Sequence, residues 1–132
     1  MKALNIILRI ALGLLVLFPI LGVLGIFPAP TPDLYNTREA YDFIHMLTVN
    51  GYTMYIMAFV FLLSLILIFL NRMALATALL LPIVVNILAF HMFLDGGLLT
   101  AGAIMADVFG ALTIYFLYKN REAYKALYNY KS

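Results

Sequence analysis

The sequence predicts an all-α membrane protein: four transmembrane helices in an antiparallel bundle, with a short outer amphipathic helix between spans 1 and 2. Three observations predict it: the composition, four long apolar runs, and basic residues gathered on one side. Of 132 residues, 66% are hydrophobic and 11% are charged, with a mean hydropathy of +1.06. A soluble domain is roughly half apolar and about a quarter charged. A globule of this size cannot bury the excess, so the composition indicates lipid as the solvent.

Each apolar run is long enough to cross the hydrocarbon core. At roughly 1.5 Å per residue, about 20 helical residues span it, and only helices satisfy their backbone polar groups in so short a chain. The first run is too long for a signal-peptide core and lacks a small-residue cleavage site, so we expect it to be retained. The expected spans, within a single domain 1–132, are residues 3–27, 52–70, 73–94 and 98–118.

The basic residues predict the orientation. Seven of the eight Lys and Arg residues fall on the side that holds the N-terminus, the 71–72 turn and the C-terminal tail. The other side has only Arg38, among several acidic residues. By the positive-inside rule, both termini lie in the cytoplasm and the protein lies in the cell membrane. An odd number of spans would divide the basic cluster, so the charges also favour four.

Two segments lie outside the spans. In the outer segment 28–51, three prolines stop the first helix, Asn36 and Glu39 resemble a capping box, and Gly51 is a natural stop. Apolar residues at helical spacing between them predict a short amphipathic helix on the outer surface. The tail 119–132 alternates basic residues with tyrosines. It is either an anchor on the inner leaflet or a solvated extension of span 4.

Asn86 and Asp107 are polar residues within the expected spans. Such side chains cost a few kcal/mol in lipid and usually face a partner inside the bundle. Counting from the span ends places both near the midplane, so across the tight 95–97 hairpin we expect the Asn86 amide to donate to Asp107. The pair is either polar glue between helices or part of a ligand or ion site.

His91, Asp95, His45 and Arg9 complete the set of candidate ligand-binding residues. His91 and Asp95 are four residues apart on one helix face, so the carboxylate is expected to orient or charge the imidazole. His45 is expected at a similar level. Two histidines without a third ligand disfavour haem and predict no metal site, whereas a quinone head group suits them better. Arg9 either snorkels to the phosphate level or pairs inward with Asp107.

Two absences restrict the chemistry. The chain has no cysteine, which excludes disulfides, thiolate zinc sites, iron–sulfur clusters and CxxC redox chemistry. The net charge is only +2, with the basic residues near the ends of the spans, so nucleic-acid binding is not predicted.

The third span has a recognisable sequence. NRMALATALLLPIVVNILAFHMFLDGG at 71–97, with its NR turn and its LLP, VVNI and FH elements, resembles the DoxX family of small four-helix membrane proteins. LRIALGLL, GIFPAPTP, FIHMLTVNGY and the ending YFLYKNREAYKAL are also similar, so the resemblance covers nearly the whole chain. Family members often carry a glutamate early in span 2 and another in span 4. Here the corresponding residues are Phe61 and Thr113.

The resemblance implies a redox-linked setting, because the family is named after a subunit of a thiosulfate:quinone oxidoreductase and other members are linked to thiol-stress complexes. We expect an accessory or ligand-binding subunit without autonomous catalysis, which holds a lipophilic molecule such as a quinone, or a partner protein. One alternative is a membrane subunit of a quinone-linked oxidoreductase, with His91 as proton acceptor and the electron donor on another protein. A second is a small proton-coupled transporter that uses Asp107. The expected partners are the lipid bilayer and either a redox subunit or further copies of the chain.

Overall fold

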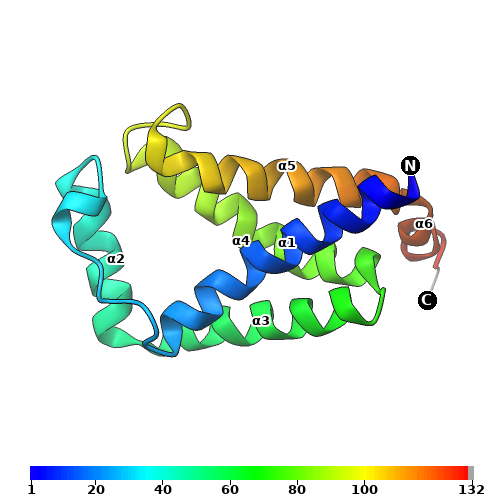
Figure 1. The fold of residues 1–132 in the computed structure, drawn as a ribbon, viewed down its shortest axis with the longest axis horizontal. Coiled ribbons are helices and arrows are strands. Elements are labelled where there is room, and N and C mark those ends of the chain that lie inside the picture. The colour runs from blue at the N-terminus through cyan, green and yellow to red at the C-terminus, as the bar shows by residue number, and fades with distance from the viewer. Residues whose placement is uncertain (131–132) are drawn as a thin grey trace.

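The computed structural model describes residues 1–130, and these fold into helices joined by short connections (Figure 1). The elements are α1 (Lys2–Val23), η1 (Pro32–Leu34), α2 (Arg38–Asn50), α3 (Tyr52–Phe69), α4 (Met73–Phe93), η2 (Ala101–Ala103), α5 (Ile104–Lys119) and α6 (Arg121–Asn129). Four segments are long and apolar enough to cross a membrane: α1, α3, α4 and the stretch from η2 through α5. The predicted fold class is confirmed.

The four long helices run side by side, and each is antiparallel to the neighbours that it packs against. In Figure 1 both termini lie at one end of the bundle, which we call the termini end. Helix α2 crosses the opposite end, the α2 end, at a steep angle to the long helices. Helix α1 packs on α3, α3 on α4 and α4 on α5, and α5 returns to α1. The bundle therefore closes around a shared core.

The core is apolar, and so is most of the outer surface. The buried core residues are Leu12, Val16, Ile20, Phe61, Ile68, Met73, Ala76, Leu80, Val84, Phe109, Leu112 and Phe116. Large apolar side chains such as Phe59, Phe93 and Ile114 are exposed on the outside of the same helices. Soluble proteins rarely expose so much contiguous apolar surface, whereas lipid accepts it. The bundle therefore has the surface of a multi-pass membrane protein.

Two spans differ from their expected bounds. Helix α1 ends at Val23, four residues early, because Gly25 adopts a φ of +75° that a helix does not continue through. The last span begins at Ala101, three residues late, because Gly96 and Gly97 also have positive φ and lead into a short loop. The connection between α4 and α5 is therefore longer than the expected 95–97 hairpin.

The expected amphipathic helix is present as α2, but its N-cap is Thr37. The Thr37 hydroxyl accepts the N–H of Ala40 at 3.1 Å, as a capping side chain does. Gly51, with a φ of +72°, ends the helix as expected. The expected capping role of Asn36 is wrong, and its side chain bonds to a different segment.

The tail is a separate helix that docks on the bundle. The Tyr124 hydroxyl donates to the carbonyl of Ala74 at 2.7 Å and lies 3.1 Å from the hydroxyl of Thr77. Tyr128 is exposed and free to meet lipid or water. Neither interpretation of the tail anticipated this docking. Lys131, one of the basic residues of the predicted cytoplasmic side, lies outside the described residues.

Candidate functional site

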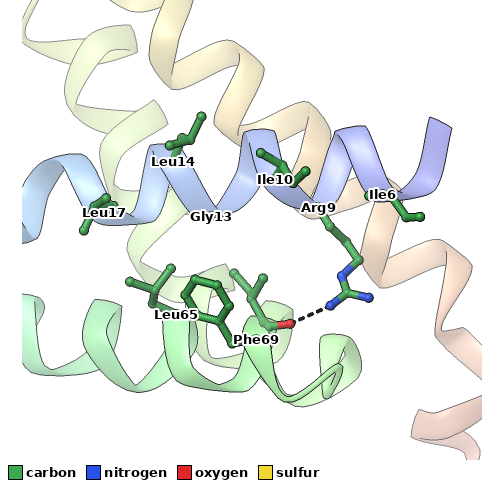
Figure 2. A pocket seen from close by; sticks show the side chains of 9 residues that line it. Ile6, Arg9, Ile10, Gly13, Leu14, Leu17, Leu65 and Phe69 are labelled. Atoms are coloured by element: carbon green, nitrogen blue, oxygen red, sulfur yellow. Dashed lines mark hydrogen bonds between the residues drawn. The ribbon is translucent and has the colours of Figure 1, made fainter. Parts of the chain in front are cut away.

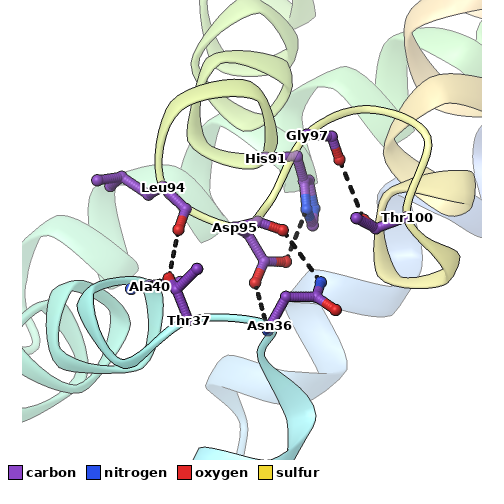
Figure 3. Close-up of polar contacts among 8 residues, drawn as sticks. All are labelled: Asn36, Thr37, Ala40, His91, Leu94, Asp95, Gly97 and Thr100. Atoms are coloured by element: carbon purple, nitrogen blue, oxygen red, sulfur yellow. Dashed lines mark hydrogen bonds and ion pairs between the residues drawn. The ribbon is translucent and has the colours of Figure 1, made fainter.

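The buried carboxylate of Asp95 is the centre of a polar network at the α2 end (Figure 3). Asp95 is 1% exposed, and its Oδ1 accepts the backbone N–H of Asn36 at 2.8 Å. Its Oδ2 lies 3.0 Å from Nδ1 of His91, and its backbone carbonyl accepts the Asn36 side-chain amide at 3.0 Å. One acidic side chain therefore joins the end of α4 to the segment that precedes α2. The expected contact between His91 and Asp95 is confirmed.

The glycine-rich turn after α4 allows the segment that contains Asn36 to approach Asp95 closely. After α4, the N–H of Gly97 bonds to the carbonyl of His91 at 2.8 Å, which closes the chain sharply. A Cβ on Gly96 would lie 3.3 Å from Cβ of Asn36, and Gly96 has a φ of +86°. Glycine therefore serves both the turn and the close approach of Asn36. The Thr37 hydroxyl donates to the carbonyl of Leu94, so a third bond holds the same two segments together.

Asp95 also determines how His91 is presented. A carboxylate that accepts from Nδ1 favours the tautomer with the proton on Nδ1, which leaves Nε2 as an acceptor. The His91 side chain is 14% exposed, and its ring packs edge-on to Phe90 with centroids 5.1 Å apart. Within residues 1–130, Nε2 has no hydrogen-bond partner. The imidazole is thus held in one orientation with one nitrogen available.

Aromatic rings extend the network toward α2. Tyr35 packs edge-on against Phe90 at a centroid distance of 6.3 Å and lies 6.1 Å from the ring of Tyr41. Burial raises the pKa of the Tyr35 hydroxyl, and the negative charge of Asp95 and the nearby Tyr41 raise it further. A raised tyrosine pKa keeps the hydroxyl protonated at neutral pH. Tyr35 is therefore a fixed hydroxyl donor beside the Asp95 network.

Tyr35 also borders a groove of about 660 Å³ at the α2 end. The groove lies between the end of α1, the loop at 25–30, α2 and the start of α3. Its wall is mostly apolar, formed by residues such as Phe18, Val23, Ile44 and Met57, with Tyr35, Thr48 and Tyr55 supplying hydroxyl groups. The Thr48 hydroxyl is already bonded to the carbonyl of Ile44, so the tyrosines are the better donors. Apolar walls with a few polar groups are typical of small-molecule sites.

The expected pair of Asn86 and Asp107 does not form. Asn86 is exposed on α4, and no hydrogen bond joins it to Asp107 in the described chain. A Cβ on Gly110 would lie 2.9 Å from Leu88, so Asp107, three residues earlier on the antiparallel α5, is level with His91. Asp107 belongs to the first turn of α5, in the third of its span nearest the α2 end. Within the span Ala101–Lys119, Asp107 lies three residues from the midpoint on the side of the α2 end, so the late start of this span brings it nearer that end than expected.

His45 and Arg9 lie apart from the Asp95 network. His45 is exposed on α2 and packs on Tyr41 at a centroid distance of 5.5 Å, without a contact to His91. Arg9 lies near the termini end and donates to Asn71 Oδ1 at 2.7 Å and to the carbonyl of Ile68 at 2.8 Å. It does not approach Asp107, so of its two expected positions only the one near the helix ends agrees with the structure. In residues 1–130 no three His, Asp or Glu side chains cluster as a metal site would require.

Sequence reasoning missed Tyr35, Asn36 and Thr37 as members of the site. Three prolines precede them, and their pattern indicated only a helix start. Asp95 itself was a signal for these missed residues. A carboxylate beside two glycines at a helix end needs hydrogen-bond donors from another segment of the chain if it is buried. No protein-family model, curated protein or solved structure matches the chain. The resemblance to the DoxX family stays a prediction.

Proposed function

We propose that the chain is a DoxX-like accessory subunit of the cytoplasmic membrane that binds a lipophilic carbonyl compound of the quinone class, without catalysis of its own. The observation that carries this is the groove at the α2 end, whose mostly apolar lining includes Tyr35. The positive-inside rule places both termini in the cytoplasm, so the groove opens at the outer leaflet.

Each part of such a ligand has a matching part of the groove. A quinone carbonyl is a hydrogen-bond acceptor, and Tyr35 supplies a hydroxyl donor that its raised pKa keeps protonated well above neutral pH. The ring fits among aromatic and methionine side chains such as Phe18 and Met57, and an isoprenoid tail can leave toward the lipid between α1 and α3.

The Asp95 network acts here as a positioning device. It bonds to the backbone and side chain of Asn36, the residue directly after Tyr35, and Phe90 packs against the Tyr35 ring. Because these contacts hold the backbone and the ring of Tyr35, its side chain loses little conformational entropy when the hydroxyl binds a ligand. His91 and Asp95 therefore support the site and need not touch the ligand.

Titration with a short-chain quinone, followed by native mass spectrometry, tests the proposal. Tyr35→Phe removes only the hydroxyl and is expected to weaken binding about tenfold, the value of one well-placed hydrogen bond. Tyr52→Phe is the matched control, because Tyr52 is exposed at the same end and does not line the groove. Wild type that retains no quinone, or equal losses in the two variants, would contradict the proposal.

Participation in a quinone-linked oxidoreductase is the second candidate, favoured by the free Nε2 of His91 beside a carboxylate. His91 would take a proton from the reduced quinone as it is oxidised, and a partner protein would accept the electrons. The transporter alternative still rests on Asp107, which lies three residues from the midpoint of its span, toward the α2 end.

A further inference from the structure

A second groove lies at the other end of the bundle, between α1 and α3 (Figure 2). Its volume is about 510 Å³, and its walls are almost entirely aliphatic and aromatic: Ile6, Ile10, Leu14, Leu17, Leu65 and Phe69. Several of these side chains are also exposed on the outside of the bundle, so the groove opens sideways toward lipid. Arg9 is the only charged residue that lines it.

The charge of Arg9 is not neutralised by the chain. Its guanidinium donates to Asn71 Oδ1 and to the carbonyl of Ile68, both of which are neutral acceptors. No carboxylate lies within ion-pair distance of Arg9 anywhere in residues 1–130. These two bonds cap the end of α3 and hold the guanidinium at the edge of the groove, and the dashed line from Arg9 in Figure 2 marks one of them. A fixed cation beside an apolar surface lacks only an anion.

The depth of Arg9 indicates which anion it meets. Arg9 is level with the last turn of α3, where that helix leaves the apolar layer. The groove continues along α1 from there to Leu17, a distance of roughly 12 Å at about 1.5 Å per residue. A cation at the head-group level with an apolar channel below it matches an amphiphile that carries its negative charge at one end.

We propose that this groove binds an anionic phospholipid of the leaflet at the termini end, with its phosphate on Arg9 and one acyl chain along α1 and α3. A phospholipid satisfies both the unpaired charge and the apolar walls. Inorganic phosphate would use the charge alone and would have to enter from a hydrocarbon surface. The site is separate from the groove beside Tyr35 and does not depend on the function proposed for it.

Gly13 provides a means to block the acyl channel without touching Arg9. A Cβ at Gly13 would lie 3.8 Å from Leu65 and 4.0 Å from Ile68, which is ordinary contact, so the backbone accepts a side chain there. A leucine at this position would project into the groove that Gly13 lines. Gly13→Leu is therefore expected to displace lipid while leaving the cap on α3 intact.

Native mass spectrometry of the protein from vesicles of equal phosphatidylglycerol and phosphatidylcholine content tests the site. Wild type is expected to retain phosphatidylglycerol preferentially, and Arg9→Gln to lower that preference about fivefold, the effect of one basic residue at an anionic surface. Arg72→Gln is the matched control, because Arg72 is an exposed cation at the same end that does not line the groove. Gly13→Leu is expected to lower retention of both lipids.

Three results would overturn the proposal. They are a wild type without preference for the anionic lipid, an Arg72→Gln variant that loses as much as Arg9→Gln, and displacement of the lipid by millimolar inorganic phosphate. Arg9→Lys covers the case in which Arg9→Gln fails to fold, since it keeps the charge while weakening the cap. It is expected to retain most of the lipid preference.

Discussion

At the scale of single residues, Asp95 joins the end of α4 to the segment that precedes α2. Its two carboxylate oxygens contact Asn36 and His91, and the bond to Asn36 joins segments almost 60 positions apart in the sequence. The backbone carbonyls of Leu94 and Asp95 add bonds from Thr37 and Asn36. Because the side chain is buried, its removal leaves a backbone donor without an acceptor.

Asp95→Ala is therefore expected to lower the free energy of unfolding by about 2–4 kcal/mol, the cost of breaking a buried charged network. Unfolding in a mixed detergent series, followed by circular dichroism, measures this. Asp42→Ala is the control, because Asp42 is exposed and pairs only with Arg38 on the surface of α2. A loss below about 1 kcal/mol for Asp95→Ala would show that the network does not hold the two segments.

Asn86 is the opposite case, a polar residue that the bundle does not use. Its side chain is exposed on α4 and has no hydrogen-bond partner in the described chain. Asn86→Leu is expected to leave the free energy of unfolding unchanged or slightly higher, since leucine partitions favourably into lipid. The alternative is that Asn86 contacts a second copy of the chain, and light scattering, run alongside the unfolding series, checks this by measuring the particle size. A clear destabilisation together with a smaller particle would mean that Asn86 contacts a second copy.

At the scale of elements, α6 shows how one hydroxyl can decide where a helix lies. Tyr124 bonds to Ala74 in the first turn of α4, and Thr77 below it is fully buried. Tyr124→Phe is expected to cost about 1 kcal/mol and to speed proteolysis of the tail, because Thr77 keeps its bond to Met73 while α6 loses its anchor. Limited trypsin digestion measures this, with the exposed Tyr128→Phe as control. Equal rates of tail cleavage in Tyr124→Phe and Tyr128→Phe would contradict the docking of α6 through Tyr124.

The elements also show what sequence reasoning can reach. Apolar length and proline or glycine stops predicted all four spans and α2, because these signals are local and each helix in lipid must satisfy its own backbone. Asp107 lies nearer the α2 end of its span than predicted, because three residues of loop after Gly97 moved the start of the last span. The i, i+4 contact of His91 and Asp95 was predictable for the same local reason. The contacts of Asn36 and Arg9 were not, because they join segments distant in sequence.

At the scale of the whole molecule, the distribution of charge and the bundle agree on one topology. Both termini lie at one end, and α2 with its preceding loop lies at the other (Figure 1). The basic residues of the termini end predict that it faces the cytoplasm. Because the chain contains no cysteine, single cysteines can report the side of each segment against an empty background.

Asp33→Cys, in the exposed loop at the α2 end, is expected to react with a membrane-impermeant maleimide in intact cells. Lys125→Cys, exposed on α6, is expected to react only after the membrane is opened, because the positive-inside rule predicts that both termini face the cytoplasm. The reverse pattern would invert the protein and place the Tyr35 groove at the inner leaflet and the Arg9 groove at the outer one. Labelling of both positions from the same side would be incompatible with Asp33 and Lys125 lying at opposite ends of a membrane-spanning bundle. The two cysteines therefore test the orientation separately from the fold, and the result decides which leaflet supplies each ligand.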